Sequence, residues 1–289
     1  MELREKAYAK LNFGLDVLRR REDGYHELLT VMQSVSLCDE ITLRLSGGES
    51  ISADANLKYL PKGEKNIAVR AALLFFETTG IPIQGGEIEI IKNIPVCAGM
   101  AGGSTDAAAV LRALNRAFST GLGRSDLEEM AYKLGSDVPF CLRGGTVLCR
   151  GRGEIMTDLP PIPKCWAVIC KPPFSISTSE LFAIIDCGKI RNRPDMDGLI
   201  KAIEQGDVER IARRVYNVLE DVLPPQYSEV GVIKAKLIDY GALGASMTGT
   251  GPSVFGLFKD PDTAGRAYDL LKKQYRECYL AVTTEKLDV

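Results

Sequence analysis

The 289-residue sequence predicts an α+β protein built from two domains. Residues 7–17 alternate between apolar and polar side chains, which is typical of a strand with one buried face. A glycine-rich stretch at 95–109 follows a strand-like segment and precedes a helix-like one. A change of composition at 159–163, Leu-Pro-Pro-Ile-Pro, then predicts a boundary between a domain of residues 1–160 and a domain of residues 161–289.

Two polar side chains mark the first predicted strand. Lys10 and Asn12 lie on the same face of residues 7–17, because side chains two positions apart in a strand point the same way. Their separation of roughly 6.5 Å allows both to contact one small molecule. An antiparallel strand with an ordinary solvated face fits the pattern equally well.

The next segment contains the single histidine of the chain. Residues 22–24, Glu-Asp-Gly, predict a turn, and Tyr25 and His26 follow it directly. No serine or cysteine stands at a recognisable spacing to make His26 part of a nucleophilic triad. We therefore interpret His26 as a recognition residue.

Simple signals predict the elements that lead to the glycine-rich stretch. Alternating apolar residues predict a strand at 41–45. Asn66 is a suitable N-cap for a helix that ends near Gly80. Alternation predicts another strand at 86–91, which Lys92 follows. Taken alone, Asn66 and Lys92 are an ordinary cap and an ordinary charge at a strand end.

The stretch 95–109, PVCAGMAGGSTDAAA, carries the strongest functional signal. We expect Gly99, Gly102 and Gly103 to let the backbone approach a ligand and to permit positive φ angles. The N-terminus of the predicted helix at 107–118 faces this loop, and its free N–H groups suit a polyphosphate. Gly103 stands where a Walker A loop requires lysine, and the dinucleotide-binding glycine spacing is also missing.

The start of that helix offers two hydroxyl groups. Ser104, Thr105 and Asp106 are residue types that favour a helix start. The hydroxyls of Ser104 and Thr105 can hold phosphate oxygens or a hydrated Mg²⁺. A turn that only caps the helix is the simpler alternative, but three glycines, two hydroxyls and an acid within eight residues favour phosphate binding.

Another acidic residue follows the next predicted helix. Apolar spacing predicts a helix that begins at Ser125 and that Gly135 stops. Asp137 comes two residues later, and we expect Pro139 to force Val138 into an extended conformation. Asp137 would then lie on a stiff exit from the helix. A Ser-Asp turn bonded to its own backbone is an equal alternative.

The second half predicts an antiparallel sheet with helices on one face. A short strand at 146–149 comes before it. The expected strands are 166–170, 243–248, 253–258 and 278–284, and the expected helices are 179–186, 197–204, 207–222, 228–240 and 261–275. Gly249 and Gly251 lie between two of these strands, where a plain hairpin turn would explain them.

Composition argues against several classes of protein. A net charge of -2 and a pI of about 5.7 do not suit a protein that binds nucleic-acid backbones. The eight cysteines form no C-x-x-C pair and one histidine cannot complete a metal site with them, so we expect reduced thiols. No apolar run approaches the length of a membrane span, and the N-terminal segment carries no secretory signal. We expect a cytoplasmic protein.

Four stretches together resemble the GHMP kinases, a family of small-molecule kinases. They are 9–12 (AKLN), 23–26 (DGYH), 95–108 (PVCAGMAGGSTDAA) and 135–139 (GSDVP), and the resemblance extends from about residue 6 to residue 258. Met100 and Ala101 replace leucine and glycine that are frequent in the family, and Thr105 replaces a serine. The resemblance implies a two-domain fold, with a ribosomal-protein-S5-like N-terminal domain and a ferredoxin-like C-terminal domain.

The resemblance implies an ATP-dependent alcohol kinase that uses Mg²⁺. The motifs fit best the branch that phosphorylates the 2-hydroxyl of a cytidine diphosphate derivative of methylerythritol, in the non-mevalonate route to isoprenoid precursors. A homoserine or mevalonate kinase is the alternative, although it should lack the segment 23–26. A non-catalytic ATP sensor would not need Lys10 and Asp137. The sequence shows no basic face of the kind that an RNA-binding module requires. We expect no nucleic-acid or membrane partner, and a monomer or weak homodimer.

The resemblance also implies roles for individual residues. Asp137 is the catalytic base, and Lys10 orients the hydroxyl and stabilises charge. The implied ATP site comprises Asn66, Lys92, Pro95, Val96, Cys97, Ala98, Gly99, Met100, Ala101, Gly102, Gly103, Ser104, Thr105, Gly249 and Gly251, with Ser104 or Thr105 at the Mg²⁺. The implied substrate site comprises Asn12, Tyr25, His26 and Phe182, with the cytosine between Tyr25 and Phe182. From the residues alone, Phe182 could equally belong to the core.

Overall fold

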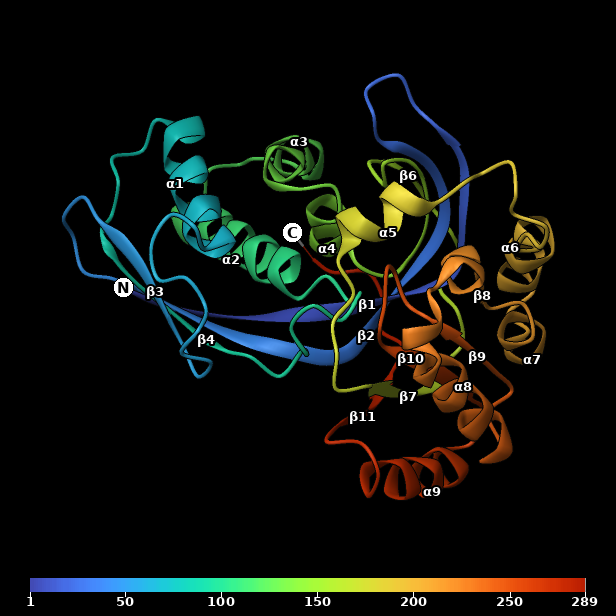
Figure 1. The fold of residues 1–289 in the computed structure, drawn as a ribbon. Coiled ribbons are helices and arrows are strands. Elements are labelled where there is room, and N and C mark those ends of the chain that lie inside the picture. Colours follow the sequence, from blue (N-terminus) through green and yellow to red (C-terminus); the bar gives the residue numbers. More distant parts are fainter. Residues whose placement is uncertain (289) are drawn as a thin grey trace.

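A computed structural model describes residues 1–288 as two sheets with helices packed around them (Figure 1). The larger sheet consists of β1 (Glu2–Arg20), β2 (His26–Leu45), β3 (Ile51–Ala55), β4 (Gly86–Ile91), β5 (Thr146–Gly151), β6 (Ile155–Asp158) and β8 (Tyr216–Asn217). Its strand order is β3-β4-β2-β1-β8, and β5 pairs with both β2 and β6. The α+β class is confirmed.

The strands β1 and β2 form a long antiparallel hairpin with bulges. Both strands are longer than predicted: β1 extends beyond residues 7–17, and β2 extends well beyond residues 41–45. The polar face of β1 is not solvated: Lys10 is 3% exposed and Asn12 is 1% exposed. The alternative of an ordinary wet face is therefore wrong. Two buried polar side chains on one strand need partners, because an unpaired buried polar group is costly.

Four helices cover one face of the larger sheet in Figure 1: α1 (Ile67–Thr79), α2 (Gly102–Phe118), α3 (Arg124–Leu134) and α4 (Val138–Arg143). Two predicted boundaries are confirmed. The Asn66 side chain caps α1 by accepting a hydrogen bond of 3.0 Å from the N–H of Ala68, and Gly80 ends the helix with φ of 69°. Gly135 follows the last residue of α3.

Two expectations about helix starts are wrong. Val138 is not extended but is the first residue of α4, because a proline in the first turn of a helix replaces an N–H that would have no partner there. The helix α2 begins at Gly102, two residues before Ser104, and its N-cap is Ala101 with φ of 60° and no side-chain cap. Gly102 and Gly103 are thus helical, and Gly99, with φ of 72°, is the one glycine of the three that needs a positive φ.

The second half forms the smaller sheet from β7 (Trp166–Lys171), β9 (Gly244–Met247), β10 (Val254–Phe258) and β11 (Glu277–Val282), in the order β11-β7-β10-β9. Its helices are α5 (Thr178–Ile184), α6 (Met196–Glu204), α7 (Val208–Ala212), α8 (Glu229–Asp239) and α9 (Pro261–Lys272), with 3₁₀ turns at Val218–Val222 and Pro225–Tyr227. The helices α8 and α9 cover one face of this antiparallel sheet, as predicted.

The predicted helix at 207–222 is wrong. It is divided into α7, the short strand β8 and a 3₁₀ turn. Tyr216 and Asn217 pair in parallel with Gly14 and Leu15 of β1, so a tertiary strand pairing overrides the local helical pattern.

The second face of the smaller sheet packs against the larger sheet. Phe13 of β1 stacks on Phe255 of β10 with ring centroids 5.8 Å apart, within a core that both halves share. Near this core, the N–H of Asn12 within β1 donates to Oγ1 of Thr248, the residue that follows β9. Among residues 1–288, no helix is both long and apolar enough to cross a membrane.

Candidate active site

A cavity of about 1010 Å³ gathers most of the predicted site residues. The predicted residues that line it are Lys10, Asn12, Tyr25, His26, Cys97, Gly99, Ala101, Ser104, Asp137, Phe182, Gly249 and Gly251. The predicted residues that do not are Asn66, Lys92, Pro95, Val96, Ala98, Met100, Gly102, Gly103 and Thr105. The cavity therefore combines the glycine-rich loop, the first strand and elements of the second half.

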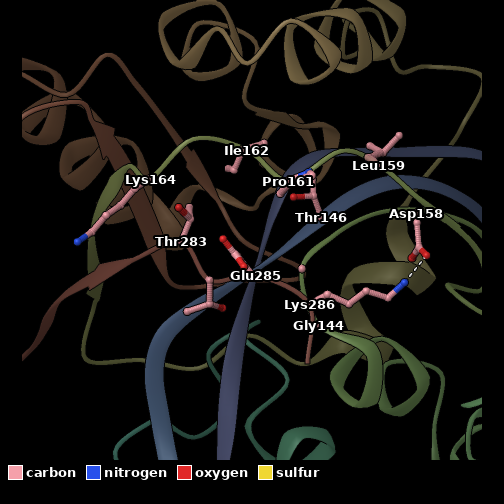
Figure 2. A pocket seen from close by; sticks show the side chains of 12 residues that line it. Gly144, Thr146, Asp158, Leu159, Pro161, Ile162, Lys164, Thr283, Glu285 and Lys286 are labelled. Atoms are coloured by element: carbon pink, nitrogen blue, oxygen red, sulfur yellow. Dashed lines mark hydrogen bonds and ion pairs between the residues drawn. The ribbon is translucent and has the colours of Figure 1, made fainter. Parts of the chain in front are cut away.

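A smaller cavity of about 380 Å³ lies elsewhere, between the chain segment before β7 and the C-terminal residues (Figure 2). Its charges are mixed: Lys286 pairs with Asp158 at 2.5 Å, and Glu285 and Lys164 also line the cavity. None of the predicted site residues lines it. Of these two cavities, only the larger one is lined by predicted site residues.

Lys10 and Asp137 meet inside the larger cavity. The Lys10 Nζ lies 3.8 Å from Oδ2 of Asp137, and the Lys10 side chain is 4% exposed while that of Asp137 is 35% exposed. Asp137 stands at the N-cap of α4 but makes no capping bond with its side chain. Its carboxylate is therefore available to a ligand, beside a buried cation that can stabilise negative charge.

Asn12 connects this pair to the second half of the chain. Its Oδ1 accepts hydrogen bonds from Lys10 Nζ at 2.6 Å, from the N–H of Gly249 at 2.9 Å and from Thr248 Oγ1 at 3.2 Å. Its Nδ2 donates to Thr30 Oγ1 at 2.8 Å. Both polar atoms of this 1% exposed side chain are thus engaged by the protein. Asn12 fixes the ammonium of Lys10 and one end of the loop at Gly249.

Close backbone approach explains the glycine at position 99. A Cβ at Gly99 would lie 2.0 Å from the carbonyl oxygen of Thr248, and the Gly99 carbonyl itself accepts from Thr248 Oγ1 at 3.2 Å. Cys97 and Ala101 hold positive φ angles of 53° and 60° although neither is glycine. The two loops, one from each half, are thus packed backbone to backbone at one end of the cavity.

Lys92 is buried in an ion cluster and is not the ordinary strand-end charge of the sequence interpretation. Its Nζ contacts Asp39 and donates to Asp106 Oδ2 at 2.7 Å and to the carbonyl of Gly102 at 3.2 Å. Burial raises the pKa of Asp106 to about 8, against the opposing effect of the Lys92 ammonium and with the help of the Asp39 charge. The cluster ties the first turn of α2 to the end of β4.

The two hydroxyls proposed for Mg²⁺ differ in access. Thr105 is 1% exposed and its Oγ1 donates to the Gly102 carbonyl at 2.8 Å, whereas Ser104 lines the cavity. Within residues 1–288, no cluster of three or more His, Cys, Asp or Glu side chains could hold a metal ion. A single accessible hydroxyl, that of Ser104, still suits Mg²⁺, which proteins often bind through one or two side chains plus phosphates and water.

Aromatic side chains occupy the other end of the cavity. The rings of His26 and Phe182 are stacked with centroids 5.2 Å apart, so Phe182 contacts this end of the cavity and is not only a core residue. Tyr25 is 53% exposed, and the guanidinium of Arg152 lies 3.7 Å from its ring centroid. Burial, and then the nearby Arg20, lower the pKa of His26, which favours its neutral form.

Sequence reasoning missed several residues that shape the site. Thr30 and Thr248 bond to Asn12, and Asn217 donates to the Gly249 carbonyl at 2.8 Å. Arg152 was also missed, although it stands between two glycines in a turn, where a side chain near a ligand is common. No local pattern marks the other three, because their partners are distant in the sequence.

Comparisons with known proteins give the family of the chain. The family GHMP kinases N terminal domain matches residues 66–145, and GHMP kinases C terminal matches residues 199–277. A 4-diphosphocytidyl-2-C-methyl-D-erythritol kinase of Clostridium perfringens is 43% identical over 97% of both chains, and one of Caldicellulosiruptor saccharolyticus is 45% identical over 97% of this chain and 96% of the relative.

Solved structures show the same likeness. A crystal structure of 4-(cytidine 5'-diphospho)-2C-methyl-D-erythritol kinase superposes with a TM-score of 0.83 at 32% identity and covers 98% of this chain and 99% of that one. A homoserine kinase from Cytophaga hutchinsonii superposes with a TM-score of 0.75 at 25% identity, over 99% of this chain and 95% of that one.

Proposed function

This chain belongs to the GHMP kinase family, among the 4-diphosphocytidyl-2-C-methyl-D-erythritol kinases, and from that premise we propose that it phosphorylates the 2-hydroxyl of 4-diphosphocytidyl-2-C-methyl-D-erythritol with ATP. One observation carries the proposal. The pair Lys10 and Asp137 lies in the same cavity as the glycine-rich loop and an aromatic pair. A nucleotide and a second, ring-bearing substrate can therefore meet at one acid and one cation.

Asp137 accepts the proton of the attacking hydroxyl. Phosphoryl transfer requires little covalent chemistry from the protein, so positioning and charge stabilisation carry most of the rate. The carboxylate is partly exposed to the cavity and has no capping role, which leaves it free to hold that hydroxyl. Lys10, fixed by its bond to Asn12, orients the hydroxyl and stabilises the charge that develops on its oxygen.

The glycine-rich loop and the start of α2 bind the triphosphate of ATP. Free N–H groups at a helix N-terminus favour anions. Ser104 is the residue we assign to Mg²⁺, because the hydroxyl of Thr105 already donates to the protein. Mg²⁺, when bound, neutralises charge on the β and γ phosphates. Lys92 supports the loop through the carbonyl of Gly102, with its ammonium already engaged by two carboxylates.

The cytidine end selects the substrate. The rings of Tyr25, His26 and Phe182 form an aromatic surface at the far end of the cavity, and His26 offers both a donor and an acceptor.

We propose a cytoplasmic location, where ATP is supplied. The eight free thiols fit a reducing compartment. The homoserine and mevalonate alternatives are less well supported than this reading, since the curated relatives at 43% and 45% identity share one name.

Replacing Asp137 by asparagine tests the proposed chemistry. We expect Asp137→Asn to lower turnover by roughly 10²–10⁴-fold, the usual effect of losing a positioned base, with ATP affinity little changed. Asp158→Asn is the matched control, because this exposed carboxylate lines the smaller cavity and pairs with Lys286. An Asp137→Asn enzyme within a few-fold of the parent would remove this aspartate from the mechanism.

A substrate panel tests the identity of the alcohol. The purified enzyme with ATP and Mg²⁺ should phosphorylate 4-diphosphocytidyl-2-C-methyl-D-erythritol much faster than homoserine, mevalonate or methylerythritol phosphate. Comparable rates with the last three compounds would place the chain in another branch of the family, because none of them carries the cytidine group that the aromatic surface is proposed to bind.

A further inference from the structure

Two arginines of the larger cavity have no role in the proposed mechanism. Arg20 and Arg152 both line it, and within residues 1–288 neither forms an ion pair. Their neighbours differ: Arg19 pairs with Glu27 and Arg21 pairs with Asp23. Unpaired cations that face a cavity indicate an anionic ligand, because a guanidinium matches carboxylate and phosphate oxygens in a planar, two-pronged geometry.

The position of Arg152 is fixed by the turn between β5 and β6. Gly151 and Gly153 on either side of it adopt φ angles of 73° and 117°, and the Arg152 N–H donates to the Glu154 carboxylate. The guanidinium lies 3.7 Å from the centroid of the Tyr25 ring. This contact places the guanidinium over the Tyr25 ring. The Nε is buried and has no hydrogen-bond partner among the described residues.

The same turn lies beside the catalytic aspartate. A Cβ at Gly153 would be 3.9 Å from Oδ1 of Asp137 and 3.7 Å from the carbonyl oxygen of Ser136. The turn that carries Arg152 thus reaches both sites: its guanidinium lies over Tyr25, and the neighbouring Gly153 lies close to Asp137. In the proposed substrate, the group between the cytidine and the reacting alcohol is a diphosphate.

We propose that Arg152 binds the diphosphate of the cytidine substrate, with the ring of Tyr25 as the surface that orients its guanidinium. The proposal rests on the proposed function and adds a residue that sets substrate affinity through charge. Lys10 is already assigned to the reacting hydroxyl, and its ammonium donates to Asn12 and lies 3.8 Å from Asp137. Arg20 is more exposed and adds a weaker, long-range attraction.

Binding of cytidine and of cytidine diphosphate (CDP) to an Arg152→Gln variant separates charge recognition from stacking. Titrations are made by calorimetry with a saturating non-hydrolysable ATP analogue, so that the probes cannot occupy the ATP site. We expect Arg152→Gln to weaken CDP binding by roughly tenfold, the effect of one lost charge-assisted contact, and cytidine binding by less than about twofold. The loss for CDP should shrink at high salt.

Arg150→Gln is the matched control. Arg150 is an exposed arginine of the same hairpin, two residues away, and does not line the cavity. It should leave both affinities unchanged, and thermal melting should show that both variants are folded. In turnover assays, Arg152→Gln should raise the KM for the cytidine substrate with kcat and the KM for ATP close to the parent values, and Arg152→Lys should recover part of the loss.

Two results would overturn the proposal. Equal losses for cytidine and CDP would mean that Arg152 acts only by supporting Tyr25, and unchanged CDP binding would mean that it does not reach the diphosphate. A parent protein that bound neither cytidine nor CDP would instead refute the proposed function itself, and with it the premise of this inference.

Discussion

The two ends of the cavity are held in different ways. At the end that we propose binds the ATP phosphates, here called the phosphate end, the loops around Gly99 and Gly249 contact each other through their backbones, and the buried side chain of Asn12 bonds to one of them. At the cytidine end, Tyr25 is 53% exposed and the contacts are between side chains, such as the stacking of His26 on Phe182. The phosphate end is therefore built from buried backbone contacts, whereas the cytidine end is built from contacts between partly exposed side chains.

This difference separates two kinds of mutational effect. A change at the phosphate end alters buried hydrogen bonds and backbone contacts, so it should reduce stability and turnover together. A change at the cytidine end removes partly exposed side chains, so it should reduce substrate affinity and leave the fold intact.

Gly99→Ala should produce the largest loss. The added Cβ would lie 2.0 Å from the Thr248 carbonyl oxygen. Position 99 also has a φ of 72°, which residues other than glycine rarely adopt. Together, strain and overlap should cost about 2–4 kcal/mol of unfolding free energy and abolish most turnover. Urea unfolding and steady-state kinetics measure the two effects.

Gly103→Ala is the control for that experiment. A Cβ there meets only Ile67 Cγ2 at 3.4 Å, and the residue is helical. Its stability should change by less than about 1 kcal/mol. If Gly99→Ala were as stable as Gly103→Ala, the backbone contact between the two loops would not be needed for the fold.

Asn12→Ala and Asn217→Ala should divide stability from catalysis. Both asparagines are buried and both hydrogen-bond to Gly249, but only Asn12 also holds Lys10. Each loss should cost about 1–3 kcal/mol through unsatisfied buried groups. Asn12→Ala should additionally lower kcat by roughly tenfold or more, because the ammonium of Lys10 loses its fixed position. Equal kcat values in the two variants would contradict the role given to Asn12.

The sequence predicted the parts of this site that depend on local chemistry. Asn66 caps a helix because its side chain reaches an N–H two residues away, and Gly135 follows the end of another. The resemblance of the stretches 9–12, 95–108 and 135–139 indicated Lys10, the loop and Asp137 in advance, and all three line one cavity.

Interactions between distant segments were not predictable. The strand at Tyr216 forms only because β1 offers a free edge near Gly14, so the helical pattern of 207–222 was misleading. Val138 is helical because Pro139 can occupy a first helical turn as well as follow an extended residue. The partners of Lys92, Asp39 and Asp106, are 53 and 14 residues away from it. No local period encodes such contacts.

Aromatic truncations at the cytidine end should change affinity only. Tyr25→Ala and His26→Ala should each raise the KM for the cytidine substrate by roughly tenfold, since a stacking contact contributes about 0.5–1.5 kcal/mol and a lost hydrogen bond about 1–3 kcal/mol. The KM for ATP and the melting temperature should stay near the parent values. Tyr59→Ala, at a tyrosine that is 70% exposed and does not line the cavity, is the control. A large fall in melting temperature for Tyr25→Ala would mean that the cytidine end also contributes to the stability of the fold, which contradicts the proposed difference between the two ends.

The smallest expected effect concerns the pH dependence of stability. Burial and the Arg20 charge lower the pKa of His26, so the folded protein binds a proton less readily than the unfolded chain does. Stability should therefore fall as the pH drops through the ordinary histidine range of about 6.5 and level off below the folded pKa, by a few tenths of a kcal/mol for this partly exposed ring. The chain has a single histidine, so the histidine contribution is that of His26 alone.

Proton NMR can follow that titration directly, because one histidine gives one set of imidazole resonances. The folded protein should show a pKa below 6.5, and Arg20→Gln should move it upwards by removing a nearby cation. Arg19→Gln is the control, since Arg19 already pairs with Glu27. Addition of CDP should also raise the pKa, because a bound diphosphate would offset the unpaired positive charge at this end of the cavity. If the pKa of His26 were 6.5 or higher and neither Arg20→Gln nor CDP changed it, nearby arginines would not act on His26 through their positive charge.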